Sequence, residues 1–231
     1  MTTTEQPTRR QAGPPLALLA TISLLLLAAG IATSAALGGV FPSPFGAADA
    51  IQDYFARHPD AVRAGAVFAF ASAVPLAIYA ATASARLRTL GVTAPGATIA
   101  LAGGLISATM LSLSGLLQWV LSRPAVRTDV PVVRAVQDLS FLTGGVAHVV
   151  FLGLLLAGIA VPALFTGLLP RPLAITGLVI AFVAEVSTVS LIWSGASVLL
   201  PIARFPGLIW LIIAGLLLPS TRPRRHTGPQ R

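Results

Sequence analysis

One acidic side chain lies inside an apolar stretch of this sequence: Glu185, near the middle of residues 173–200. A charged group within hydrocarbon costs about 3 kcal/mol on insertion scales, so such a residue marks a functional site by default. As a protonatable site, Glu185 would couple proton movement to transport. The alternative is a structural role, in which its carboxyl group is hydrogen-bonded to a neighbouring helix. Glu185→Gln would abolish proton-dependent transport in the first case and be nearly silent in the second.

His148 is the one histidine inside an apolar stretch, residues 139–165. Paired with Glu185, it would form the acid–base couple of an intramembrane enzyme. If the two stretches form a hairpin that turns at residues 168–169, His148 is level with Val189, and Glu185 lies about 6 Å deeper at a rise of 1.5 Å per residue. A direct contact therefore needs a register shift or an intervening water molecule.

Hydroxyl groups complete the set of candidate polar-site residues. Three of them lie in the stretch 97–121 at a depth comparable to that of Glu185: Ser107, Thr109 and Ser112. The fourth, Thr188, lies one turn from Glu185 on the same face. The absence of cysteine excludes disulfides, thiol catalysis and iron–sulfur clusters. A bis-histidine haem would need a second histidine inside an apolar stretch, and a metal site would need three or four clustered ligands. We therefore expect no cofactor, no metal ion and no assigned catalytic residue.

Composition indicates a membrane protein. Of the 231 residues 55% are hydrophobic and only 10% are charged, against about 25% charged residues in soluble domains. The net charge is +8, but the arginines separate apolar stretches and do not form a basic face, which favours membrane topology over nucleic-acid binding. Every basic residue is Arg, which is typical of a GC-rich bacterial genome. These features predict a multi-pass protein of the bacterial plasma membrane.

Six apolar stretches predict an all-α polytopic bundle of about six transmembrane helices, since about 20 apolar residues span the hydrocarbon core. The first exceeds the core of a signal peptide and is expected to be retained, with cleavage near Ser34 as the alternative. The sixth is short and would cross with local thinning of the bilayer. The stretches are 16–38, 61–85, 97–121, 139–165, 173–200 and 205–218.

Arginine distribution predicts that both termini are cytoplasmic. Nine arginines then lie inside and six, including Arg204, lie outside, in the direction of the positive-inside rule. Residues 1–15 form a cytoplasmic tail, residues 16–219 form one transmembrane domain, and residues 220–231 form a basic cytoplasmic tail. Arginines in the second tail could contact anionic lipid, each contributing about 1 kcal/mol: Arg222, Arg224 and Arg225.

Two amphipathic segments are expected on the outer face. Residues 47–57 place Ile51, Tyr54 and Phe55 on one side of a helix. A similar segment at residues 131–137 follows Asp129, a residue suited to cap a helix. Both segments could pack as lids over the bundle.

Several short motifs resemble one family. They are Phe41-Pro42-Ser43-Pro44-Phe45, Ala73-Val74-Pro75-Leu76, Ala85-Arg86-Leu87-Arg88, Gly144-Gly145 with His148, and Arg204-Phe205-Pro206-Gly207. Over roughly residues 16–219 the chain resembles the actinobacterial multi-pass proteins grouped under domain of unknown function 4386. The resemblance implies a membrane bundle but no activity. We therefore expect a structural or binding component, with an ion-coupled carrier using Glu185 and an enzyme using Glu185 and His148 as alternatives; the lipid bilayer is the one expected partner.

Overall fold

The described part of the chain is a bundle of α-helices. The computed structural model describes residues 13–220 and contains no β-strand within them. Within this range, six helical segments are long and apolar enough to cross a membrane, which confirms the predicted all-α polytopic fold. The tail arginines Arg222, Arg224 and Arg225 lie outside the described residues.

The six spans are built from seven of the nine α-helices found in residues 13–220. Two short 3₁₀ turns lie at the ends of the last two spans: Ser187–Leu191 ends the fifth and Ser194–Val198 begins the sixth. A π-helical segment, Leu142–Ala147, interrupts the fourth. The α-helices are α1 (Leu16–Gly38), α2 (Ala48–Arg57), α3 (Pro59–Thr89), α4 (Gly96–Leu121), α5 (Pro124–Arg127), α6 (Val130–Phe141), α7 (His148–Thr166), α8 (Arg171–Val186) and α9 (Leu199–Leu217).

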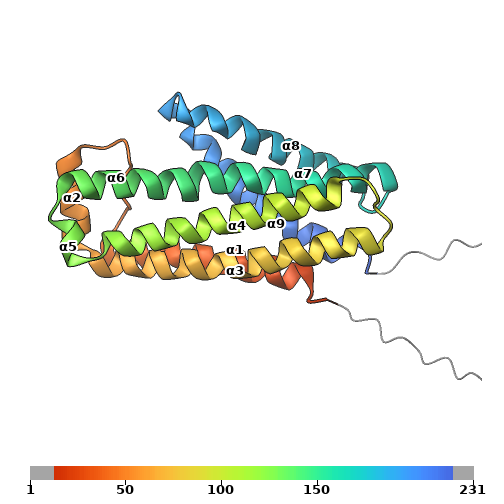
Figure 1. Ribbon diagram of the computed structural model, residues 1–231, viewed down its shortest axis with the longest axis horizontal. Helices are drawn as coiled ribbons and strands as arrows, with labels where there is room; N and C mark the ends of the chain where they lie inside the picture. The colour runs from red at the N-terminus through yellow and green to blue at the C-terminus, as the bar shows by residue number, and fades with distance from the viewer. Residues whose placement is uncertain (1–12, 221–231) are drawn as a thin grey trace, which may run out of the picture.

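The spans form a ring in which sequence neighbours pack side by side. α3 packs between α1 and α4, α4 packs against α7, and α7 packs against α8. α9 crosses the bundle obliquely and contacts both α8 and α1, which closes the ring (Figure 1). The start of α1 and the end of α9 are in contact: a Cβ atom added at Gly215 would lie 2.9 Å from the Leu16 Cβ.

Small residues allow the helices to approach closely, as is common between membrane helices. A Cβ atom at Gly103 of α4 would lie 2.7 Å from the Leu155 nitrogen of α7. At Gly115 it would lie 2.9 Å from the Ala66 carbonyl oxygen of α3. Glycine is therefore required at both crossings of α4.

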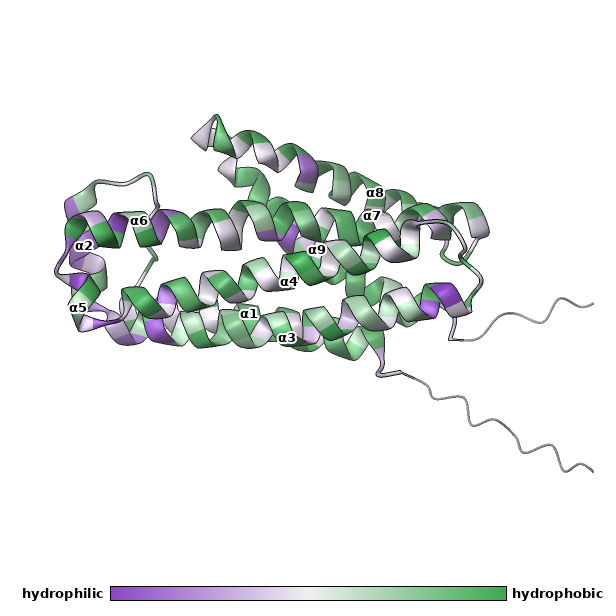
Figure 2. Ribbon diagram, viewed as in Figure 1, coloured by the Kyte–Doolittle hydropathy of each residue, from purple (hydrophilic) through white to green (hydrophobic). Residues whose placement is uncertain are grey.

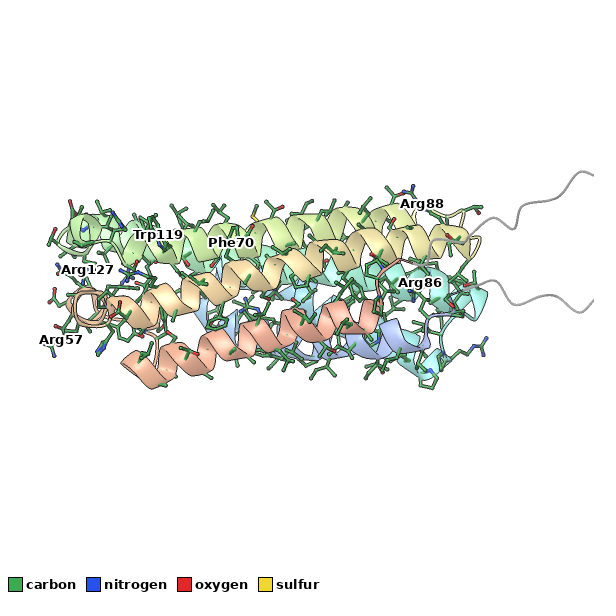
Figure 3. All side chains as sticks on the ribbon, turned by 90° about the horizontal axis from the view of Figure 1, so that it is seen from below. Arg57, Phe70, Arg86, Arg88, Trp119 and Arg127 are labelled. Carbon is green, nitrogen blue, oxygen red and sulfur yellow. The ribbon has the colours of Figure 1, made fainter. Side chains whose placement is uncertain are left out.

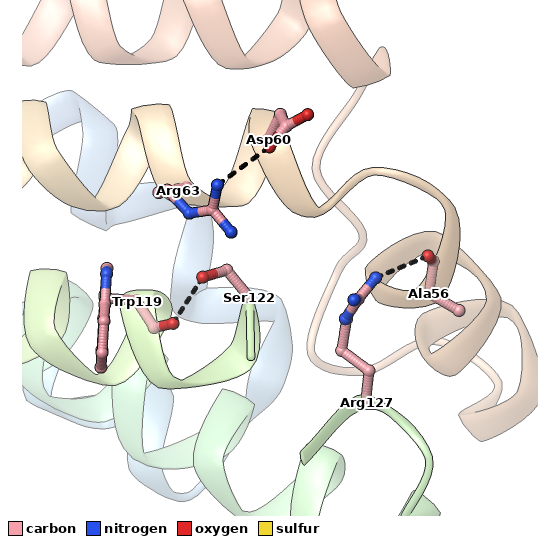
Figure 4. Close-up of polar contacts among 6 residues, drawn as sticks. All are labelled: Ala56, Asp60, Arg63, Trp119, Ser122 and Arg127. Carbon is pink, nitrogen blue, oxygen red and sulfur yellow. Dashed lines mark hydrogen bonds and ion pairs between the residues drawn. The ribbon is translucent and has the colours of Figure 1, made fainter. Parts of the chain in front are cut away.

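Polar residues gather at one end of the bundle, which we call the α2 end; it carries α2, α5 and the start of α6 (Figure 2). The apolar side of α2 covers this end, with Ile51 and Phe55 buried against Val133 of α6. Arg127 donates a 3.0 Å hydrogen bond to the Ala56 carbonyl of α2 (Figure 4). Figure 3 places Arg57 and Arg127 at this end and Arg86 and Arg88 at the opposite one.

The last two spans differ from the sequence prediction. The stretch 173–200 is not one helix, because the chain turns around Ile192 and Trp193, both of them exposed. The sixth helix begins at Leu199 instead of Phe205 and continues through Pro206. Membrane helices tolerate an internal proline because neighbouring groups satisfy the freed carbonyl, so treating Pro206 as a helix boundary was wrong. As a consequence Arg204 lies inside α9.

Candidate functional site

A cavity of about 630 Å³ lies within the α2-end half of the bundle, a size typical of small-molecule sites. α1 and α9 contribute opposite ends of the described chain to its wall, and the segment Gly39–Phe45 covers it. Its lining from the helices comprises Leu27, Gly30, Ile31, Ser34, Ala35, Gly65, Ala69, Leu111, Ser114, Gln118, Gln137, Ser140, Phe141, Gly144, Gly145, Leu200, Pro201 and Arg204, with Ser197 from the preceding turn.

Part of the cavity lining reaches the bundle surface on α1 and on α9. Its lining residues Ile31 and Ala35 on α1 and Pro201 on α9 are exposed at the bundle surface. These positions belong to segments that are long and apolar enough to cross a membrane, and in a bilayer an opening there would face lipid. A ligand could therefore enter from the bilayer.

Serine and glutamine side chains make part of the wall polar. The Ser114 hydroxyl of α4 donates to the Ser140 carbonyl at 2.8 Å, and the two hydroxyl oxygens are 3.1 Å apart. Gln137 donates a 3.2 Å hydrogen bond to the Pro42 carbonyl, which fixes the covering segment to α6. The Gln137 Oε1 atom is buried and has no hydrogen-bond partner among the described atoms.

Aromatic residues close the cavity at the α2 end. The Phe41 ring of the covering segment makes edge contacts with Tyr54 and Phe55 of α2, at centroid distances of 5.6 and 5.5 Å. Burial raises the pKa of the Tyr54 phenol, and the nearby Ser34 hydroxyl partly offsets that effect. The Tyr54 phenol therefore stays neutral beside Ser34, a residue of the cavity wall.

Arg204 is the charged residue of the cavity wall. Its guanidinium group donates to the Gly144 carbonyl of the π-helical segment, and its Nε atom is buried without a hydrogen-bond partner. Within residues 13–220 the ion pairs are those of Arg57, Arg63 and Arg134, so no carboxylate there neutralises Arg204. A charge near the middle of a span is costly unless it has a partner.

The π-helical segment supplies the acceptor for Arg204. Such segments are rare and occur frequently at functional sites. A Cβ atom at Gly144 would lie 2.6 Å from the Ser114 Cβ, so glycine is needed for α4 to pack here. The same residue therefore serves the helix contact and the hydrogen bond to Arg204.

Of the residues expected from the sequence, the structure brings His148 and Ser107 together. The Ser107 hydroxyl lies 2.9 Å from His148 Nδ1 and 2.8 Å from the His148 carbonyl oxygen, and Nδ1 is 3.1 Å from the Ser107 carbonyl. Both residues are buried, and His148 Nε2 has no hydrogen-bond partner in the described region. The pair ties α7 to α4 through two polar side chains.

The other expected residues are dispersed over the bundle surface. Glu185 is exposed on α8, with its carboxyl group beside Gly153 of α7, and Thr188 is exposed in the turn beyond it. Thr109 donates to the carbonyl of Leu105 and Ser112 to that of Thr109, both within α4. Among the described residues no hydrogen bond joins Glu185 to His148 or to these hydroxyl groups.

The comparisons add no relative to this description. Neither the family models nor the curated proteins nor the solved structures include a match to the chain.

Proposed function

We propose that this chain is an integral protein of the bacterial plasma membrane that binds a small amphiphilic molecule in the cavity between α1 and α9. Both termini are cytoplasmic in this proposal, and the α2 end faces outward. Membership of domain of unknown function 4386 is part of the same proposal, and it adds no activity.

The observation that carries the proposal is a cavity with two kinds of wall and an opening within the spans. Its mouth is apolar, formed by Ile31, Ala35 and Pro201, whereas Ser114, Ser140 and the two glutamines make its interior polar. Sites for small molecules are mostly apolar, with a few polar groups that orient the ligand. An amphiphile has the matching distribution of polar and apolar atoms.

The carrier and enzyme alternatives depend on Glu185, and their support is weaker. Glu185 is exposed on α8, and neither α7 nor α8 contributes to the cavity wall. A binding role depends on the residues that line the cavity, and Glu185 is not one of them.

The test is photo-crosslinking in vesicles of zwitterionic lipid. A monoacylglycerol that carries a mid-chain diazirine serves as the probe, and mass spectrometry locates the labelled peptides. Labelling of residues 27–35 and 197–204 that an excess of unlabelled monoacylglycerol suppresses is expected. Labelling spread evenly over the surface and insensitive to competitor would disprove the proposal.

A matched pair of variants sharpens this test. Ala35→Trp places a bulky ring at the cavity mouth and should reduce the labelling at least several-fold. Ala36→Trp adds the same ring at the next exposed position of α1, which does not line the cavity, and should leave the labelling unchanged. Equal labelling of both variants would contradict entry between α1 and α9.

A further inference from the structure

We propose that Arg204 binds the anionic head group, a carboxylate or a phosphate, of the amphiphile held in the cavity. This inference rests on the proposed function and adds the charge of the ligand to it. In this proposal Arg204 makes the cavity selective for anionic over neutral ligands.

The first support is the unbalanced charge. Arg204 lies within the sixth candidate span, Ser194–Leu217, where an isolated guanidinium group is unfavourable. Among the described residues, those that line the cavity include no Asp or Glu. An anion is therefore the component that would balance this charge inside the bundle.

The second support is the unused hydrogen-bonding capacity of Arg204. A guanidinium group has five N–H donors in a planar fork, and carboxylates and phosphates accept from two of them at once. One terminal nitrogen donates to the Gly144 carbonyl, and the buried Nε–H has no partner among the described atoms. The contact with Gly144 orients the fork and leaves donors for a ligand.

The third support is the position of the guanidinium group. A long basic side chain near a helix end usually extends to the membrane interface. Arg204 instead turns to the π-helical segment of the fourth span and forms part of the cavity wall. The head group that it would bind therefore lies inside the cavity, with the chain of the ligand directed to the opening beside Ile31 and Pro201.

The experiment extends the photo-crosslinking assay to three probes with the same diazirine-bearing chain: a fatty acid, a lysophosphatidate and the neutral monoacylglycerol. Each is compared at equal concentration in the bilayer. One of the anionic probes is expected to label the cavity peptides with at least about tenfold higher apparent affinity than the neutral probe, as a charge-assisted hydrogen bond implies. Preference for the fatty acid identifies a carboxylate ligand, and preference for the lysophosphatidate identifies a phosphate.

Two substitutions assign this preference to Arg204. Arg204→Gln should remove it while the neutral probe still labels the cavity, and Arg204→Lys should retain part of it, because Lys keeps the charge but not the fork. Arg123→Gln is the matched control, since Arg123 lies over the Trp119 ring at 5.0 Å and outside the cavity. If Arg204→Gln fails to fold, the wild-type preference and Arg204→Lys still decide the question.

The outcomes separate this inference from the proposed function. Saturable labelling by all three probes with equal affinity would overturn the role of Arg204 and leave the binding cavity in place. An unchanged preference in Arg204→Gln would have the same meaning. If no probe gives saturable labelling of the cavity, both the proposed function and this inference fall.

Discussion

At the scale of single residues, burial separates two kinds of polar side chain in the spans. Thr109 and Ser112 of α4 donate to carbonyl groups of their own helix, so their hydrogen bonds do not depend on a neighbour. Ser107 is buried and bonds to His148 of α7. Removing a buried partner costs more than removing an exposed one, because the remaining group stays unsatisfied.

Ser107→Ala should lower the free energy of unfolding by about 0.5–1.5 kcal/mol, because the buried hydroxyl bonds to His148 are lost while Nδ1 keeps the Ser107 backbone carbonyl as a partner. Titration of the micelle-bound protein with a denaturing detergent measures this change. Thr109→Ala, two residues away on the same helix, is the control and should change stability by less than about 0.5 kcal/mol. Equal effects of the two substitutions would show that the Ser107–His148 pair contributes nothing to stability.

At the scale of the elements, the hydropathy of the sequence predicted where most of the helices lie. The bounds of α1 agree with the predicted stretch 16–38, and a helix forms at Ala48–Arg57 where an amphipathic one was expected. Hydropathy could not show how each helix is rotated, because both lipid-facing and buried faces are apolar. Ser114 and Ser140 therefore carried no signal of their own, although they face each other in the fold.

Arg204 was missed for a different reason. A proline two residues later suggested a helix boundary and placed the arginine in an outer loop. The signal that could have located it is the apolar sequence on both sides, Leu199–Ala203 and Gly207–Leu217. An arginine between two such segments fits a span that continues through proline.

Packing between α4 and α7 gives a prediction at this scale. Gly103→Ala should destabilise the fold by about 1–3 kcal/mol, because the new methyl group would lie 2.7 Å from the Leu155 nitrogen, a backbone atom that cannot move alone. Gly207→Ala of α9 is the control, since its nearest side-chain atom would be 3.4 Å away. That change should be neutral or stabilising by up to about 1 kcal/mol. The same detergent titration compares them, and a tolerated Gly103→Ala would contradict the close crossing.

At the scale of the whole molecule, the ring of spans places both ends of the described chain at one end of the bundle, opposite α2. The proposed orientation puts that end in the cytoplasm. The two ends of the bundle then differ in access to reagents outside the cell. The absence of native cysteine makes this difference measurable with single-cysteine variants.

Ala56→Cys on α2 should react with a membrane-impermeant maleimide added to intact cells, because Ala56 is exposed at the α2 end. Thr93→Cys, exposed in the turn between α3 and α4, should react only after the cells are opened. The two variants serve as controls for each other. The reverse pattern would place both termini outside and invert the proposed topology.

The π-helical segment sets the helical phase of the fourth span. Each residue of an α-helix advances the side chains by about 100°, and a π-helical turn accommodates one residue more than an α-helical turn does. Deleting Gly145 would allow regular α-helix from α6 into α7 and turn α6 by about that angle relative to α7. Ser140 would then rotate away from Ser114, and Gln137 from Pro42. The deletion of this one residue would therefore leave the six apolar spans in place and remove the polar wall of the cavity.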